Sequence, residues 1–154
     1  KSYFHQMTGV KDFPLIITDD LTTTNQARLG TAIEKDAGSA IIIKPNQIGT
    51  ITETIEVARL AGRAGWRKIV SHRSGDTPDD FIADLAVGIS AWGIKAGAPK
   101  TPVRLTKYNR LMEIEEEIAV SQKKFFRKAL RQLERNAPRE QKSDVILLPR
   151  LRSY

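Results

Sequence analysis

Short apolar runs alternate with longer stretches of helical periodicity over the first 118 residues of the chain. The apolar runs are nearly continuous, as strands buried in a parallel sheet are, and they lie at Leu15 to Thr18, Ala40 to Ile43, Lys68 to Val70 and, more weakly, Gly93 to Ala96. The stretches with the spacing of amphipathic helices are Asn25 to Asp36, Thr52 to Ala64, Asp79 to Ser90 and Arg104 to Glu117. This order predicts an α/β fold of about four βα units with a parallel sheet and right-handed crossovers.

Polar and ionisable residues stand where each predicted strand ends. They are Asp19 and Asp20 after the first run, Lys44 with Pro45, Asn46 and Gln47 after the second, Ser71, His72, Arg73 and Ser74 after the third, and Lys95 within the fourth. Taken singly, each has a structural explanation, such as a turn cap, a solvated strand end or a satisfied loop histidine. Taken together they indicate a site, because in a closed parallel barrel the strand ends converge on one cavity.

The types of residue at these strand ends suit an anionic substrate held with a divalent metal. Asp19 is a hard oxygen ligand of the kind that Mg²⁺ prefers. Arg73 offers a planar fork for a phosphate group, and Ser74 adds a hydroxyl donor. Of the two lysines, one can act as a base and the other can stay charged to neutralise developing negative charge. Proton abstraction next to a carboxylate is therefore plausible.

Composition excludes several classes of protein. The 154 residues have ordinary globular proportions, with 40% hydrophobic and 28% charged residues. The lack of cysteine excludes a disulfide framework and a thiolate metal site. No apolar run approaches the roughly 18 residues of a membrane span, and the beginning of the chain lacks the pattern of a secretory signal. These features predict a water-soluble, untargeted chain, and Lys1 as first residue predicts a partial sequence of a longer protein.

The net charge of +7 is confined to the end of the chain. Residues 1–118 carry 15 basic and 15 acidic residues, whereas residues 119–154 carry 10 basic and 3 acidic residues. This balance argues against nucleic acid as a partner of residues 1–118. A basic tail can meet nucleic acid or an acidic membrane surface, although most such segments are solvated faces.

Five segments of the chain resemble the C-terminal half of the enolases in both order and spacing. They are "TDDLTTTN" (18–25), "IIIKPNQIGTITET" (41–54), "SHRSGDTPDDFIADLAVG" (71–88), "GIKAGAP" (93–99) and "RLTKYNRLMEIEEE" (104–117). The similarity covers roughly residues 10–118, and the proline after Lys44 resembles the bacterial branch of the family more than the animal branch.

The resemblance implies half of an eight-stranded TIM-like (β/α)8 barrel and the reversible dehydration of 2-phosphoglycerate to phosphoenolpyruvate, with Mg²⁺ as cofactor. Residue by residue, it implies that Asp19 binds metal and substrate, that Lys44 removes the proton from C2, and that Arg73 and Ser74 bind phosphate. Ser71 and His72 would lie in the substrate pocket, and Lys95 would contact the carboxylate region of the substrate. Asp19 is preferred to Asp20 as the metal ligand by spacing alone.

The resemblance also implies features that lie outside these segments. An enolase needs an N-terminal capping domain and earlier barrel strands, which supply a general-acid glutamate and two further metal carboxylates. The family implies a homodimer or larger homo-oligomer, a cytoplasmic location, and export to the cell surface or medium without a signal in some members. We therefore expect residues 1–118 to be part of a barrel domain and residues 119–154 to be a separate basic tail.

The tail after residue 118 is unlike the end of an enolase. Phe126, Leu130 and Leu133 stand at helical spacing among basic residues, Pro138 follows as a stop, and an apolar "VILLP" run begins at Val145. This pattern predicts a basic segment that is helical or irregular. It is open to three readings: an extension of the last helix, a sequence artefact, or a basic amphipathic helix that binds RNA or a membrane.

A second hypothesis for the whole chain comes from another class of protein. It is a non-catalytic half-barrel that binds phosphorylated ligands, or nucleic acid through its tail, without turnover. The two hypotheses differ in whether an attached capping domain supplies the missing carboxylates.

Overall fold

Four parallel strands and five helices make up the part of the chain described by the structure, a computed structural model that covers residues 15–136. In chain order the elements are β1 (Ile17–Thr18), α1 (Gln26–Glu34), β2 (Ala40–Ile43), α2 (Pro45–Ile48), α3 (Ile51–Arg63), β3 (Arg67–Ser71), α4 (Phe81–Gly88), β4 (Gly93–Lys95) and α5 (Pro102–Asn136). The predicted alternation of strand and helix is confirmed, with the short α2 added between β2 and α3.

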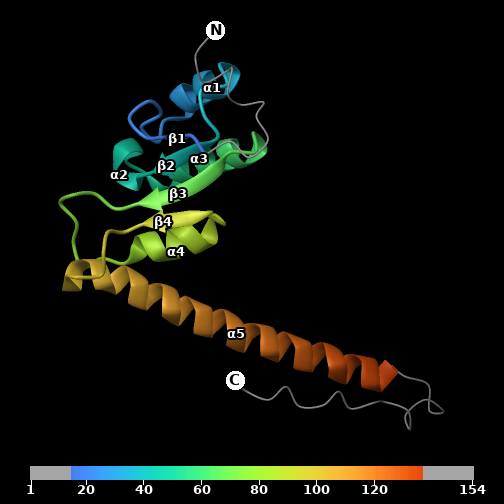
Figure 1. Ribbon diagram of the computed structural model, residues 1–154. Coiled ribbons are helices and arrows are strands. Elements are labelled where there is room, and N and C mark those ends of the chain that lie inside the picture. Colours follow the sequence, from blue (N-terminus) through green and yellow to red (C-terminus); the bar gives the residue numbers. More distant parts are fainter. Residues whose placement is uncertain (1–14, 137–154) are drawn as a thin grey trace. The chain divides into compact units, whose positions relative to one another are not determined.

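The sheet has the strand order β1-β2-β3-β4, and every neighbouring pair is parallel (Figure 1). Each strand therefore lies beside the strand that precedes it in the sequence, which is the arrangement of consecutive βα units in a barrel. The ladder continues past the last paired residues, because the N–H of His72 donates to the carbonyl of Lys95 at 3.0 Å.

Side chains cap two of the helices that connect the strands, α1 and α3. Asn25 accepts a hydrogen bond from the N–H of Arg28 at 3.0 Å and so begins α1. Thr50 caps the start of α3, where its hydroxyl accepts from the Glu53 N–H at 3.2 Å and donates to the Glu53 carboxylate at 2.6 Å. Between them, α2 ends at Gly49, whose φ of 104° is a conformation that favours glycine.

Two apolar clusters hold helices against one face of the sheet. The larger joins α1, β2, α3 and Trp66, and it consists of Leu29, Ala32, Ile41, Ile43, Val57, Ala58, Ala61 and Trp66. The smaller joins α4 to β3 through Val70, Leu85 and Ala86. Alternate residues of β2, Ile41 and Ile43, thus face the helices, and so does Val70 of β3, as the twofold period of a strand requires.

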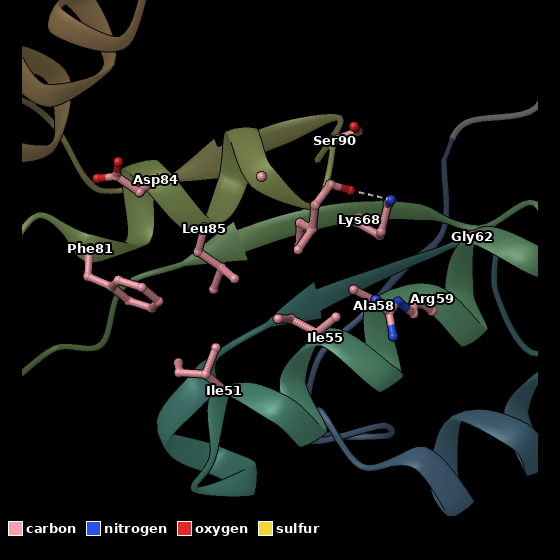
Figure 2. Close-up of a pocket in the computed structure, with 12 residues that line it drawn as sticks. Ile51, Ile55, Ala58, Arg59, Gly62, Lys68, Phe81, Asp84, Leu85 and Ser90 are labelled. Atoms are coloured by element: carbon pink, nitrogen blue, oxygen red, sulfur yellow. Dashed lines mark hydrogen bonds between the residues drawn. The ribbon is translucent and has the colours of Figure 1, made fainter.

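A cavity of about 570 Å³ lies on this helical side of the sheet. Figure 2 shows side chains from α3, including Ile51 and Ile55, on one side of it and Phe81 and Leu85 from α4 on the other. Lys68 reaches the same region and donates to the carbonyl of Ile89 at 2.5 Å. None of the predicted site residues lines this cavity, so the candidate site must be sought elsewhere.

The last helix, α5, continues well beyond the predicted helix at residues 104–117. Its first turns, up to Glu113, belong to one compact unit, and its remainder, from Ile114, belongs to a second unit. Within the first unit, the guanidinium of Arg110 binds the Asp84 carboxylate of α4 through two hydrogen bonds of 2.8 and 3.0 Å. These hydrogen bonds and the charge of Arg110 outweigh the effect of burial and lower the pKa of Asp84 below its usual value.

The boundary predicted at residue 118 falls inside α5 and stays a prediction. The predicted basic tail is helical as far as Asn136, whereas Pro138 and the "VILLP" run lie outside the described residues. Between residues 15 and 136, no helix is both long enough and apolar enough to cross a membrane.

Candidate active site

Four of the seven predicted site residues fall on one face of the sheet, opposite the helices. Ile41, Ile43 and Val70 face the helices, so their neighbours Ile42 and Ile69 face the other way. The strand register pairs Ile42 with Ile69 and Ile69 with Gly93, which aligns the alternation across the sheet.

Continuing this alternation to the strand ends places four predicted residues on the face of Ile42 and Ile69. Ser71 is two residues after Ile69, and Lys95 is its register partner. Lys44 is two residues after Ile42, and Asp19 follows β1 on the same side, since Thr18 pairs with Ile41. In a parallel barrel this face is the interior, and its C-terminal end is where active sites lie.

Asp19 and Lys44 are in direct contact at this end of the sheet. The Lys44 ammonium donates to both carboxylate oxygens of Asp19, at 2.7 and 2.8 Å, and the two side chains are 12% and 31% exposed, respectively. The neighbouring Asp20 is exposed. The structure therefore brings Asp19, rather than Asp20, to Lys44.

Thr24 positions the backbone that carries Lys44. Its buried hydroxyl accepts from the N–H of Lys44 at 2.9 Å and donates to the side-chain oxygen of Gln47 at 2.8 Å. Thr24 and the preceding Thr23 have φ angles of 51° and 45°, which are uncommon for β-branched residues. Strained conformations of this kind are retained where the surroundings enforce them, and they cluster at functional sites.

The segment after β3 presents the predicted phosphate-binding groups. Ser71 is buried, and its hydroxyl donates to the carbonyl of His72 at 2.9 Å. Arg73 and Ser74 are exposed. Lys95, on the adjacent strand, is also exposed and has Ser71 as its register partner. The guanidinium, the hydroxyl and the ammonium are thus accessible to a ligand at the same end of the sheet.

A buried lysine that the sequence analysis did not single out anchors this segment. Lys107 of α5 is 1% exposed, and its ammonium lies 3.0 Å from a carboxylate oxygen of Asp76. It also donates to the carbonyls of Thr77 and of Val103, the latter at 2.7 Å. The same oxygen of Asp76 lies 3.4 Å from Nδ1 of His72. Lys107 therefore fixes the loop that carries His72, Arg73 and Ser74.

The charges around Asp76 act on its ionisation. Burial raises the pKa of this carboxyl group, but the Lys107 ammonium, the N–H of Thr77 at 3.0 Å and His72 together lower it below 3.8. Lys107 and Asp76 are missed by a search of strand ends because neither stands at one. The sequence does contain an indication that Lys107 is buried. Leu111 follows it by four residues, so Lys107 lies on the apolar side of its helix.

The carboxylate of Asp19 is the group in this site that suits a metal ion. Asp19 offers the carboxylate oxygens that Mg²⁺ prefers, and Mg²⁺ is usually held by one or two protein carboxylates. Among residues 15–136, however, no group of three or more His, Cys, Asp or Glu side chains could hold a metal ion. Asp19 can thus serve as one ligand of a metal ion.

Comparison with known proteins agrees with the geometry. The family model "Enolase, C-terminal TIM barrel domain" matches residues 1–132. Enolase B of Dictyostelium discoideum is 57% identical over 103 residues, which are 67% of this chain and 23% of that protein. The enolases of Lactobacillus helveticus and Lactobacillus acidophilus are each 50% identical over 116 residues, which are 75% of this chain and 27% of theirs.

The chain thus spans about a quarter of the length of these curated relatives. The similarity to the bacterial branch stays a prediction, because relatives from Dictyostelium and Lactobacillus both match at high identity. The sheet order, the strand-end residues and the match over most of the chain agree on one assignment: the chain belongs to the enolase C-terminal TIM barrel domain family.

Proposed function

We propose that the protein to which this chain belongs is an enolase, a lyase that reversibly dehydrates 2-phosphoglycerate to phosphoenolpyruvate in glycolysis. The observation that carries the proposal is the contact of Asp19 with Lys44 on the face of the sheet that also bears Ser71 and Lys95. A carboxylate, two ammonium groups and a phosphate-binding loop are what an anionic substrate with an acidic C–H bond requires.

In this proposal Lys44 is the base that accepts the C2 proton at Nζ. In the structure Nζ of Lys44 contacts both carboxylate oxygens of Asp19, so this contact must open for Nζ to reach the C2–H bond of a substrate. The backbone contact with Thr24 keeps Lys44 at the strand end while the side chain moves. Lys95 would neutralise the negative charge that develops at the substrate carboxylate.

Arg73 and Ser74 would bind the phosphate group, with Ser71 and His72 beside them. The anchor through Asp76 and Lys107 orders this loop before substrate arrives, which lowers the entropic cost of binding. For the proton that leaves with the C3 hydroxyl group, the family resemblance implies a glutamate of the earlier barrel strands as the acid.

Membership of the family implies a metal cofactor in general, and we propose Mg²⁺ with Asp19 as one of its ligands. When bound, Mg²⁺ would supply positive charge next to the substrate carboxylate. A homodimer or larger homo-oligomer and a cytoplasmic location, with export in some settings, also remain proposals from family membership.

The test compares two substitutions in the complete protein that carries this chain. Lys44→Ala should lower kcat by several orders of magnitude and leave KM within about tenfold, because a proton-transfer group acts mainly in the transition state. Arg73→Ala should instead raise KM strongly, since a charged hydrogen bond to phosphate is lost. Formation of phosphoenolpyruvate is measured by its ultraviolet absorbance.

Two outcomes would count against this assignment. If Lys44→Ala and Arg73→Ala gave the same kinetic profile, the separate roles of base and phosphate ligand would be wrong. If the complete protein bound phosphoenolpyruvate with an affinity that depended on Arg73 but showed no turnover, it would be a non-catalytic binder of phosphorylated ligands. We expect the 154-residue chain alone to be inactive, because its proposed site residues include one carboxylate and no acid for the leaving group.

A further inference from the structure

The second half of α5 exposes a continuous apolar face. Phe125, Phe126 and Leu130 are 76%, 60% and 43% exposed. Ala129 is four residues after Phe125, and Leu130 is four residues after Phe126, so these two pairs lie next to each other on one side of the helix. Two neighbouring phenylalanines that are mostly exposed are unusual for a segment without an apolar partner, so this face indicates a contact surface.

The opposite face of the same segment is basic. Residues 121–136 contain six lysines and arginines and a single acidic residue, Glu134. Four of the basic residues, at positions 124, 127, 131 and 135, recur at intervals of three and four along one side of the helix, and all six are exposed: Lys123, Lys124, Arg127, Lys128, Arg131 and Arg135. The helix is therefore amphipathic, with aromatic and apolar side chains on one face and cationic side chains on the other.

The charge discriminates among three surfaces outside the protein that could cover such a helix: a second copy, a nucleic acid and a membrane. A second copy of the chain would bring two cationic helices together, and like charges oppose that contact. A nucleic acid would pair with the basic face and leave the two phenyl groups in water. A membrane surface that contains anionic lipid accepts both faces at once, because the phenyl groups enter the boundary of the acyl chains while lysine and arginine side chains reach the headgroups.

We propose that residues 121–136 form an interfacial helix that binds anionic lipid membranes. The helix lies in the plane of the interface with Phe125, Phe126 and Leu130 buried, and the basic residues make the binding depend on negatively charged headgroups. The inference rests on α5 alone and is independent of the proposed enolase activity.

The test measures cosedimentation of the 154-residue chain with lipid vesicles. One set of vesicles contains phosphatidylserine mixed with phosphatidylcholine, and the other contains phosphatidylcholine alone. We expect at least a roughly tenfold higher partition coefficient on the anionic vesicles, because each basic side chain near an anionic surface adds to the affinity. Raising the salt concentration should reduce this preference.

Two sets of variants separate the apolar from the ionic contribution. Phe125→Ser combined with Phe126→Ser should lower the partition coefficient at least about tenfold, because burial of each phenyl group favours binding by that order. Val120→Ser is the matched control, because Val120 is half exposed but lies on the basic side of the helix with Lys124 and Arg127. This substitution should change the partition coefficient by less than about twofold. Arg127→Glu with Arg131→Glu should abolish the preference for anionic vesicles.

Circular dichroism of each variant without lipid checks that the helix content is unchanged. Equal binding of the parent chain to both kinds of vesicle would overturn the proposal, as would an unaltered affinity of the Phe125→Ser, Phe126→Ser variant. Tight binding to a single-stranded RNA that survives this substitution, in the absence of vesicle binding, would assign the basic face to nucleic acid. A concentration-dependent dimer that this substitution dissociates, again without vesicle binding, would assign the apolar face to a second copy.

Discussion

Lys107→Met should destabilise the domain by about 3 kcal/mol. Methionine keeps most of the length of the side chain but removes the ammonium group, which is 1% exposed and contacts Asp76 and two backbone carbonyls. Removing one partner of a buried ion pair typically costs about 3–5 kcal/mol, because the other charge is left without compensation. The lower end applies here because the Asp76 side chain keeps 18% exposure and can recover some water.

A second substitution identifies the source of the loss. Lys107→Met combined with Asp76→Asn should recover part of the destabilisation, since the uncompensated carboxylate is gone, whereas the carbonyls of Thr77 and Val103 still lack their donor. Lys100→Met is the matched control, because Lys100 is exposed, and it should change the free energy of unfolding by less than about 0.5 kcal/mol.

The assay is urea unfolding of the parent and the variants, followed by the fluorescence of the buried Trp66 and by circular dichroism. The reasoning would be refuted if Lys107→Met unfolded at the urea midpoint of Lys100→Met. It would also be refuted if the double variant were less stable than Lys107→Met by a further 3 kcal/mol or so, because the two residues would then act independently.

Three further predictions concern the same domain. The pKa of Asp76 is lowered in the folded state, so the ionised carboxylate contributes its full stabilisation above the unfolded pKa of about 3.9, and this stabilisation is lost as the pH falls through the folded pKa. In an acid titration, the free energy of unfolding of Asp76→Asn should therefore fall less steeply below about pH 4 than that of the parent. Gly38→Ala should cost about 1–3 kcal/mol in urea unfolding, because a Cβ there would lie 2.8 Å from the buried threonine of β1, whereas Gly30→Ala in α1 meets nothing within 4 Å and should be neutral or stabilising. In the complete protein, Asp19→Asn should raise the Mg²⁺ concentration for half activity at least roughly tenfold, and a larger effect of Asp20→Asn would show that the assignment at this strand end is off by one residue.

Local patterns were sufficient to predict the order of the elements. Strand runs such as Ala40 to Ile43 are continuous in apolar residues because both faces of the strand are covered, and the helices between them show one apolar side. The residues just beyond each run could be named as site candidates because parallel strands all end at the same edge. These conclusions need only neighbours in the sequence.

The tertiary structure decided which side chains meet. Strand register determines that Asp19, Lys44, Ser71 and Lys95 share the face opposite the helices, and a shift of one residue would reverse it. The contact between Asp19 and Lys44 joins residues 25 positions apart, and the bond from Lys107 to Thr77 joins residues 30 positions apart.

Such contacts have no local signature, because they depend on how elements pack and not on the periodicity of either segment. A lysine on the apolar side of a helix shows in the sequence only that a buried partner is needed. The fold alone determines that the partner is Asp76, because packing of the first turns of α5 brings the Lys107 ammonium to the Asp76 carboxylate. At such a buried position a charge must be paired, since burying an unpaired charge would cost a large solvation energy.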